Sequence, residues 1–177
     1  MIRGLSLLLL AFALACGGAP PSSTGETTPT AAASVDNLPL ADFSIFTAVG
    51  AVEVRADGTL RENGTLVGTF SPDGAFVNVD GNEIGRLTPS GQIYFGGRLD
   101  AATIDATGTM LADPSHTIAS FDPQGNLLVG DVTLEVRGYA PEKGRSILFA
   151  FAMYSALIAV AQRMQQEQQA PQTNGLH

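Results

Sequence analysis

The residues most able to support catalysis lie between Asp113 and His116, where the sequence reads Asp-Pro-Ser-His. A carboxylate, a hydroxyl and an imidazole are the three groups of a nucleophilic triad, in which the base must lie beside its nucleophile. Asp-Pro-Ser, however, is also the composition of a tight turn, because each of these residues favours turn backbone geometry. We interpret the segment as a turn and expect no catalytic residues and no enzyme activity.

A second polar group consists of Asp73, Asp80, Asn82 and Glu83. Their oxygens could attract calcium, but the alternating ligand loop that ends in a glutamate is missing. Zinc would need three or four ligands of suitable spacing, and Cys16 is the one cysteine in the sequence. The glycines match no pattern that cradles a phosphate at the start of a helix. We therefore expect neither a metal nor a cofactor.

The charge balance limits the partners. The 177 residues carry a formal net charge of −8 at pH 7, with a hydrophobic content of 45% and 20 glycines. An acidic protein is repelled by nucleic acid and by anionic membrane surfaces, so we expect no nucleic-acid partner. The glycine-rich composition is typical of an all-β protein with many turns.

A turn glycine recurs every 16 or 17 residues between positions 55 and 137. Each glycine closes a tetrapeptide such as Ser71-Pro72-Asp73-Gly74, which predicts a type I turn followed by a bulge. Two residues after each glycine the side chain is apolar. The glycines are Gly58, Gly74, Gly91, Gly108 and Gly125, and the apolar residues are Leu60, Phe76, Ile93, Met110 and Leu127.

A second turn follows halfway through each repeat, for example at Asn63-Gly64 and Asp80-Gly81. Both pairs favour type I′ geometry, whose twist matches that of antiparallel strands. Two turns per 17 residues leave short strands, so each repeat is one β-hairpin. The sequence predicts a mainly β protein, an antiparallel meander of about ten or eleven strands that curls into a barrel or a strongly curved sheet. A solenoid of stacked hairpins is the alternative.

When the second strands of the hairpins, the return strands, are aligned on the repeat, three positions recur, which we call columns. The first and third columns are apolar and three residues apart, so they point to opposite faces unless a bulge intervenes. The middle column is always small, and it marks either that bulge or a groove for something packed on the sheet. The middle residues are Gly68, Gly85, Ala102 and Ala119, and we expect a helix to lie in their groove.

An apolar run at residues 147–161 follows the helix-start signal Pro141-Glu142. Its larger side chains share the wide face of a helix, whereas Ala152, Ser155 and Ala156 lie on the narrow one. This division favours a helix laid against the sheet. The alternative is a membrane helix whose small residues contact another membrane helix. The length of the run is borderline for this, because a full span needs about 20 apolar residues and the run has 15.

The N-terminus carries Arg3 and then an apolar run at residues 5–15, as a secretory signal does. The run ends in Leu14-Ala15-Cys16-Gly17. Here the sequence resembles bacterial lipoproteins, whose type II signal peptide is cut before a lipobox cysteine. The resemblance implies that Cys16 receives fatty acyl chains such as palmitate, and that Gly17 directs the protein to the outer membrane, at its periplasmic face or at the cell surface.

The expected organisation has five parts. Residues 1–15 are the signal peptide, 16–35 the lipidated cysteine and a flexible tether of Gly, Ala, Pro, Ser and Thr, 36–139 the hairpin repeats, 140–168 the helix and 169–177 a disordered tail.

These parts predict a lipid-anchored envelope protein that acts as a non-enzymatic structural or interaction module. Its N-terminal acyl chains would attach it to the membrane. It would contact another envelope protein. The alternative function is a carrier that encloses an apolar ligand in the curved sheet. An enzyme is the third hypothesis, and it would need a cleft with several carboxylates of raised pKa.

Overall fold

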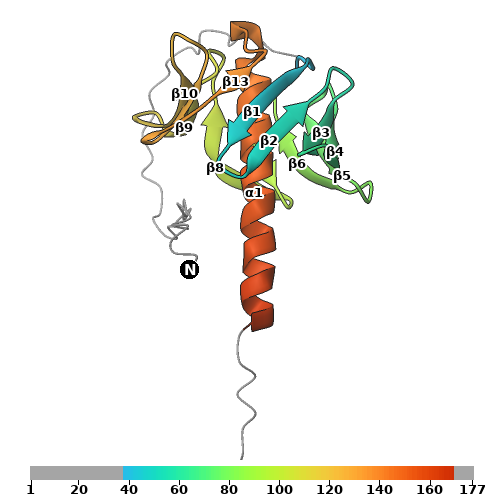
Figure 1. Cartoon of the computed structure of the whole chain (residues 1–177). Coiled ribbons are helices and arrows are strands. Elements are labelled where there is room, and N and C mark those ends of the chain that lie inside the picture. The colour runs from blue at the N-terminus through green and yellow to red at the C-terminus, as the bar shows by residue number, and fades with distance from the viewer. Residues whose placement is uncertain (1–37, 170–177) are drawn as a thin grey trace, which may run out of the picture. The chain divides into compact units, whose positions relative to one another are not determined.

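The structure is a computed structural model, and it describes residues 38–169, which belong to one compact unit. It is mainly antiparallel β, with one long helix at the C-terminal end (Figure 1). The strands are β1 (Phe43–Thr47), β2 (Gly50–Val54), β3 (Thr59–Glu62), β4 (Thr65–Phe70), β5 (Ala75–Asn78), β6 (Glu83–Leu87), β7 (Gln92–Phe95), β8 (Arg98–Ile104), β9 (Met110–Asp113), β10 (His116–Phe121), β11 (Leu127–Val129), β12 (Val132–Leu134) and β13 (Val136–Arg137). A short 3-10 helix, η1 (Pro141–Lys143), leads into α1 (Gly144–Gln169).

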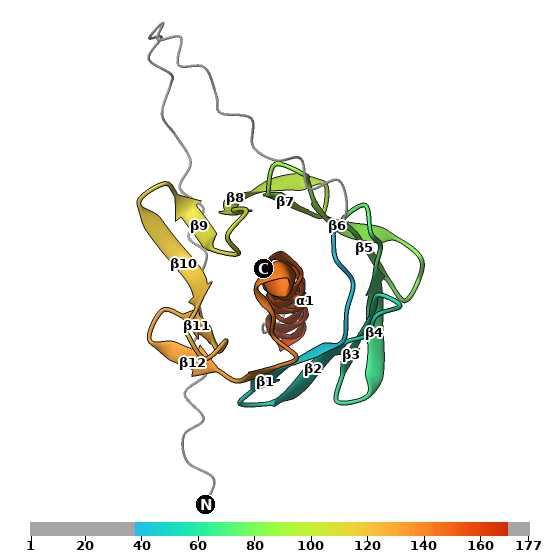
Figure 2. The same ribbon diagram turned by 90° about the horizontal axis from the view of Figure 1, so that it is seen from above.

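The sheet is a meander that nearly closes into a barrel. Each strand from β1 to β11 pairs with the next one in the sequence, so β12 lies at one end of the sheet, and β13 returns to pair with β1. The short segment 132–137 therefore joins the two edges of the sheet. Its first part, β12, pairs with β11, and further on the amide of Phe46 in β1 donates to the carbonyl of Glu135 at 2.9 Å. Seen from above, the strands surround α1 (Figure 2). The barrel predicted from the repeat is confirmed.

The repeated turn glycines all lie at one end of the barrel, which we call the entry end because α1 begins there. All five have positive φ, between 77° and 89°, and in each turn the glycine amide donates to the carbonyl three residues earlier. In four of the five turns the first residue also accepts a bond through its side chain, as Thr88 Oγ1 does from the Gln92 amide at 3.0 Å. The predicted turn is confirmed, and glycine is needed because its φ lies in the left-handed region.

The turns between β1 and β2, β3 and β4, and so on lie at the opposite end, the exit end. Asn63 and Gly64 both have positive φ, at 48° and 82°, as type I′ geometry requires. Asp80 does not, because Asn63 is the one non-glycine residue with positive φ in the described part of the chain. The type I′ prediction is therefore wrong at Asp80-Gly81. Asn78 instead begins a turn like those of the entry end, with its side chain accepting from the Asn82 amide at 2.9 Å.

Bulges explain the three columns of the return strands. Leu60 pairs with Gly68 and Arg61 with Leu66, so Val67 is an extra residue in β4. Ile84 and Ile118 are extra in the same way in β6 and β10. The bulge thus lies one residue before the small residue of the middle column. After the bulge the strand is regular, so the small residue and the apolar residue of the third column, two positions later, face the same side. That side is the barrel interior, where Gly68 and Phe70 are both buried.

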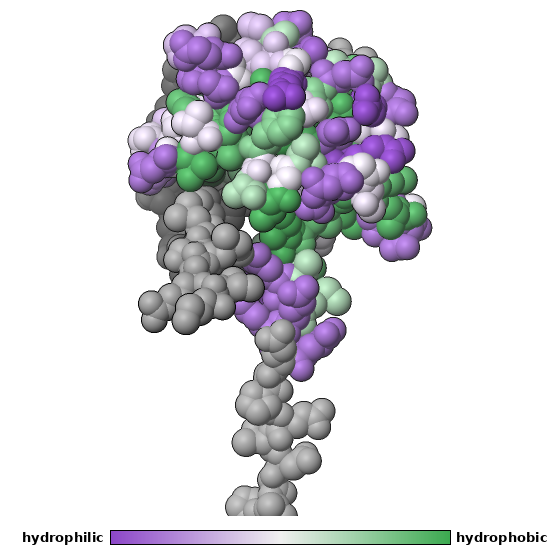
Figure 3. All heavy atoms as spheres, viewed as in Figure 1, coloured by the Kyte–Doolittle hydropathy of each residue, from purple (hydrophilic) through white to green (hydrophobic). Residues whose placement is uncertain are grey.

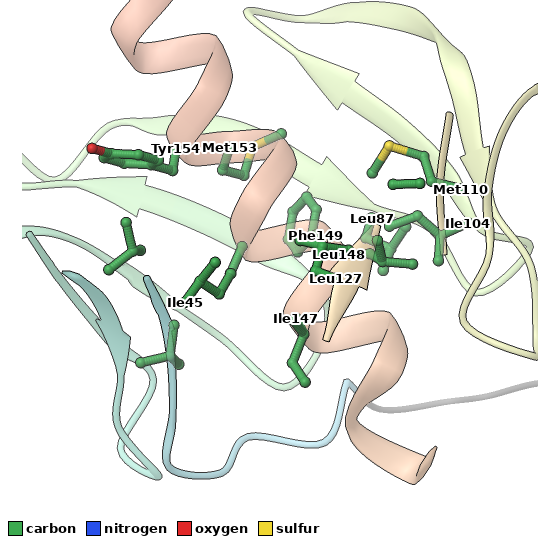
Figure 4. Packing of buried hydrophobic residues seen from close by; sticks show 14 of the residues in the cluster. Ile45, Leu87, Ile104, Met110, Leu127, Ile147, Leu148, Phe149, Met153 and Tyr154 are labelled. Atoms are coloured by element: carbon green, nitrogen blue, oxygen red, sulfur yellow. The ribbon is translucent and has the colours of Figure 1, made fainter. Parts of the chain in front are cut away.

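The first half of α1 runs inside the barrel and forms the centre of the core. Ile147, Leu148, Phe149 and Ala150 are each 0% exposed, and interior side chains of the strands surround them (Figure 4). The sequence predicted a helix laid against one face, with its small residues outward. The structure differs because strands cover every side of the helix at this level, so consecutive residues are all buried.

Acid should weaken the entry-end turns. In the turn at Asp122, hydrogen bonds from the Asn126 side chain and from neighbouring amides hold the pKa of Asp122 below its usual value of 3.8. A depressed folded pKa stabilises the protein above pH 3.8, and this contribution is lost as the pH falls through the folded value. We expect Asp122→Asn, which keeps the acceptor oxygen, to lose less stability than wild type between about pH 5 and pH 2 in urea titrations. Equal losses would contradict this role.

Candidate functional site at the helix exit

Polar contacts fix α1 in the barrel along its length. At the entry end, Ser146 Oγ donates to the carbonyl of Pro39 at 2.6 Å. Arg145 Nη2 donates to the carbonyls of Thr88 and Pro89, each at 3.3 Å. Near the exit end, Tyr154 Oη donates to Glu62 Oε1 at 2.6 Å. The helix therefore has defined partners at both ends of the barrel, which fix its depth.

Arg145 is a buried cation with few partners. Burial lowers the pKa of its guanidinium below the usual value, and Nε has no hydrogen-bond partner among the described residues. The two carbonyls at the turn of Thr88 and Pro89 are the groups that its side chain contacts through hydrogen bonds. Arg145 thus holds the first turn of α1 against an entry-end turn, and no chemistry follows from it.

Tyr154 and Glu62 close the core at the exit end. Tyr154 is 5% exposed, and both burial and the bond to Glu62 raise the pKa of its phenol above the usual value of 10. Glu62 is the last residue of β3, directly before the exit turn at Asn63-Gly64. Tyr154 is therefore the last fully buried residue of α1, and the residues after it are half-buried or exposed.

Removing the phenol hydroxyl should loosen the helix. We expect Tyr154→Phe to lower the free energy of unfolding by about 1 to 2 kcal/mol, because the Glu62 carboxylate loses a donor. A raised phenol pKa stabilises the fold below about pH 10, and the contribution is lost as the pH rises towards the folded value. Urea titrations at increasing alkaline pH should therefore show a steeper loss of stability for wild type than for Tyr154→Phe. Parallel curves would show that Tyr154 is not linked to folding.

Exposed apolar side chains gather at the exit end. The large apolar residues that the structure leaves exposed are all beside exit turns or on the part of α1 beyond them, and none is at the entry end. Figure 3 shows hydrophobic side chains at the lower edge of the barrel, where the helix leaves it. Those beside the turns, which we call the exit ring, are Val49, Leu66, Val79, Leu99 and Val132, and those on the helix are Val160 and Met164.

After Tyr154 the helix is half-buried as far as Ile158, and Leu157 and Ile158 still pack against the core. From Ala159 the helix continues outside the barrel as a post, residues 159–169. Its large exposed side chains are Val160, at 44% exposure, and Met164, at 56%. By length and composition the helical segment Pro141–Gln168 could cross a membrane, but 44% of its apolar window is buried inside the protein. The apolar character that suggested a membrane helix therefore belongs in large part to the barrel core.

The four small residues singled out in the sequence all belong to return strands. A Cβ at Gly85 would overlap with Sδ of Met153, so this glycine lies directly against α1. Ala102 and Ala119 are buried in the core, at 2% and 1% exposure. At Gly68 the space is taken instead by the ring of Phe76 from the neighbouring strand. The predicted lipidation site, Cys16, lies outside the described residues.

The polar groups considered for chemistry are turn residues. Ser115 Oγ donates to Asp113 Oδ1 at 2.7 Å, and both are exposed in the turn before β10. Asp73 and Glu83 both bind Arg86, at 3.0 and 2.6 Å, as exposed ion pairs. In the part of the chain that the structure describes, no group of three or more His, Cys, Asp or Glu residues is arranged to hold a metal ion.

The exit ring was missed in the sequence. Its members stand at or beside five of the six exit turns, where turn residues are normally polar; the turn between β9 and β10 has none. A search for large apolar residues next to these turns would have found them. No family model, no curated protein and no solved structure matches this chain.

Proposed function

We propose that this chain is a lipid-anchored protein of the bacterial envelope that acts as a non-enzymatic structural or interaction module. The anchor rests on the N-terminal sequence, where an apolar run ends at Cys16 in a lipobox-like context. The composition of residues 17–35 predicts a flexible tether, and a coil of that length would reach roughly 25 Å, enough to hold the barrel clear of the lipid headgroups. The proposed location is the outer membrane, at its periplasmic face or at the cell surface.

The filled interior supports the role as an interaction module. The barrel encloses α1, whose residues 147–150 are fully buried among the strands. An apolar ligand would need this same space, so the filled core argues against the carrier hypothesis. One open depression of about 400 Å³ lies beside β6 and β7, lined by residues that include Glu83, Arg86 and Tyr94. What the protein offers to other molecules is therefore its outer surface, and above all the apolar exit end.

Metabolic labelling with a radioactive fatty acid tests the anchor. Bacteria that express the full chain should incorporate label into wild type and not into Cys16→Ser, because the thiol is the acylated group. Membrane fractionation should then place the wild type in the outer membrane and release the variant. An unlabelled wild type, or equal label in both proteins, would overturn the proposed anchor.

A further inference from the structure

The open depression of about 400 Å³ lies against the outer side of the barrel wall, where β6 and β7 are neighbours (Figure 2). Ile93 in β7 is 1% exposed and points into the core, so the side chain of the next residue, Tyr94, faces outward. Arg86 in β6 pairs directly with Tyr94 and shares its face of the sheet. The depression therefore has an aromatic ring and a guanidinium side by side.

Two of the residues that line the depression are glycines. A Cβ at Gly85 would overlap with Sδ of Met153 inside the barrel, so this position presents only backbone to the outside. At Gly97, in the exit turn after β7, a Cβ would meet no atom within 4 Å. Glycine in a sheet often marks a place where another molecule approaches the backbone closely. A flat ligand can therefore lie against the strands beside Tyr94.

The charges in the lining cancel, because its charged residues are Glu83 and Arg86. Arg86 donates from Nε to Glu83 Oε1 at 2.8 Å and from Nη2 to Oε2 at 2.6 Å. A further bond from Nη1 to Asp73 Oδ2, at 3.0 Å, fixes the guanidinium from its other side. An anion would lie beside Glu83 and a cation beside Arg86, and neither would find an opposite charge that lacks a partner. The lining therefore favours a ligand without net charge.

The same ion pair can still bind hydroxyl groups. A carboxylate offers about four lone-pair positions, and Arg86 takes one on each oxygen of Glu83. Nη2 of Arg86 carries two N–H groups and donates one of them to Glu83. The phenol of Tyr94 can donate and accept. Because the ion pair fixes these groups before a ligand arrives, little order has to be gained on binding.

We propose that the depression binds one sugar unit of a neutral glycan. A pyranose ring has a face of C–H groups and a rim of hydroxyls. Its C–H face packs on the ring of Tyr94, whose π face is negative, and its hydroxyls bond to Glu83 and Arg86. An apolar ligand fits less well, because the depression is open and would leave one side of it in water. The inference goes beyond the proposed interaction role and does not depend on the lipid anchor.

An NMR titration of the purified chain tests the site, with the trimers of N-acetylglucosamine and of glucose as neutral probes. We expect at least one of them to shift the amide signals of residues 83–88 and 94–97, with a Kd of about 1 mM because the site is shallow. Tyr94→Ala should weaken binding about tenfold, because the stacking surface is lost. Tyr94→Phe keeps the ring and should bind clearly better than Tyr94→Ala.

Leu99→Ala is the matched control. Leu99 pairs with Tyr94 from β8 and is 56% exposed, but it is not among the residues that line the depression. Its variant should bind the trimer as tightly as wild type. All three variants should keep the circular dichroism of wild type, because the side chains that they change face outward.

Charged trimers test the requirement for a neutral ligand. At about pH 6 the amines of a glucosamine trimer and the carboxylates of a galacturonic acid trimer are charged. Both should bind more weakly than the better neutral trimer. Tighter binding of either one would assign the depression to an ionic ligand and overturn the proposal.

Three further results would overturn it. They are the absence of signal shifts with both neutral trimers at about 20 mM, shifts confined to another part of the surface, and equal binding by wild type and Tyr94→Ala. None of them bears on the anchor, which fatty-acid labelling tests separately.

Discussion

Replacing Phe149 by alanine is expected to lower the free energy of unfolding by about 3 to 5 kcal/mol. Phe149 is 0% exposed at the centre of the barrel, and its ring lies 5.3 Å from that of Phe70 in β4. Truncation leaves a cavity that strands on all sides cannot close, because their spacing is fixed by the hydrogen-bonded sheet. Equilibrium unfolding in urea measures the change.

Phe151→Ala is the matched control, since Phe151 lies two residues further along α1 and is only half-buried. Its loss should be clearly smaller. A Phe149→Ala variant as stable as Phe151→Ala would contradict the position of the helix at the centre of the core.

Replacing Gly91 by alanine should cost more than a turn substitution normally does. Gly91 has φ of +89°, and a Cβ there would overlap with the carbonyl oxygen of Ile104, the last residue of β8. The carbonyl of Gly91 also accepts from the Ile104 amide at 2.7 Å, so the turn cannot move away without losing that bond. We expect a loss of about 3 kcal/mol in urea titrations, the upper end for a single substitution.

Gly81→Ala is the matched control for Gly91→Ala, because it has the same backbone strain without the overlap between Cβ and a neighbouring carbonyl. Gly81 has φ of +83°, but no atom lies within 4 Å of a Cβ built there. Its variant should lose only the cost of a left-handed alanine, about 1 to 2 kcal/mol. If the two variants lose the same stability, the contact between Gly91 and Ile104 contributes nothing.

The repeat made the sheet predictable. Each turn glycine, and the apolar residue two positions later, follow local rules of turn geometry and strand alternation. Leu60, Phe76 and Leu127, placed in this way, are each 0% exposed. The contact of Gly91 with Ile104 was not predictable from turn rules, because it depends on the register of β7 with β8, which shifts between Gln92 and Tyr94.

The place of the helix was harder to predict. A helix on one face of a sheet should have one apolar side, and the run at residues 147–161 could be divided into such sides. A helix enclosed by strands is buried on every side, which explains Leu148 and Ala150. Only beyond Tyr154 does a polar side return, at Gln162 and Gln166. The helix therefore changes along its length from a segment that is buried on every side to a segment with one apolar and one polar side. An analysis of hydrophobic periodicity over the whole run averages the two segments and does not show where the helix leaves the barrel.

Hydrogen exchange tests most directly whether α1 is the core of the barrel. At concentrations where the chain is monomeric, the amides of residues 147–154 should exchange as slowly as those of the central strands, through global unfolding alone. Residues 163–168 should exchange much faster, because nothing in the monomer covers them. Fast exchange of residues 147–154 while the strands stay protected would contradict the account, since the barrel would then hold together without its helix.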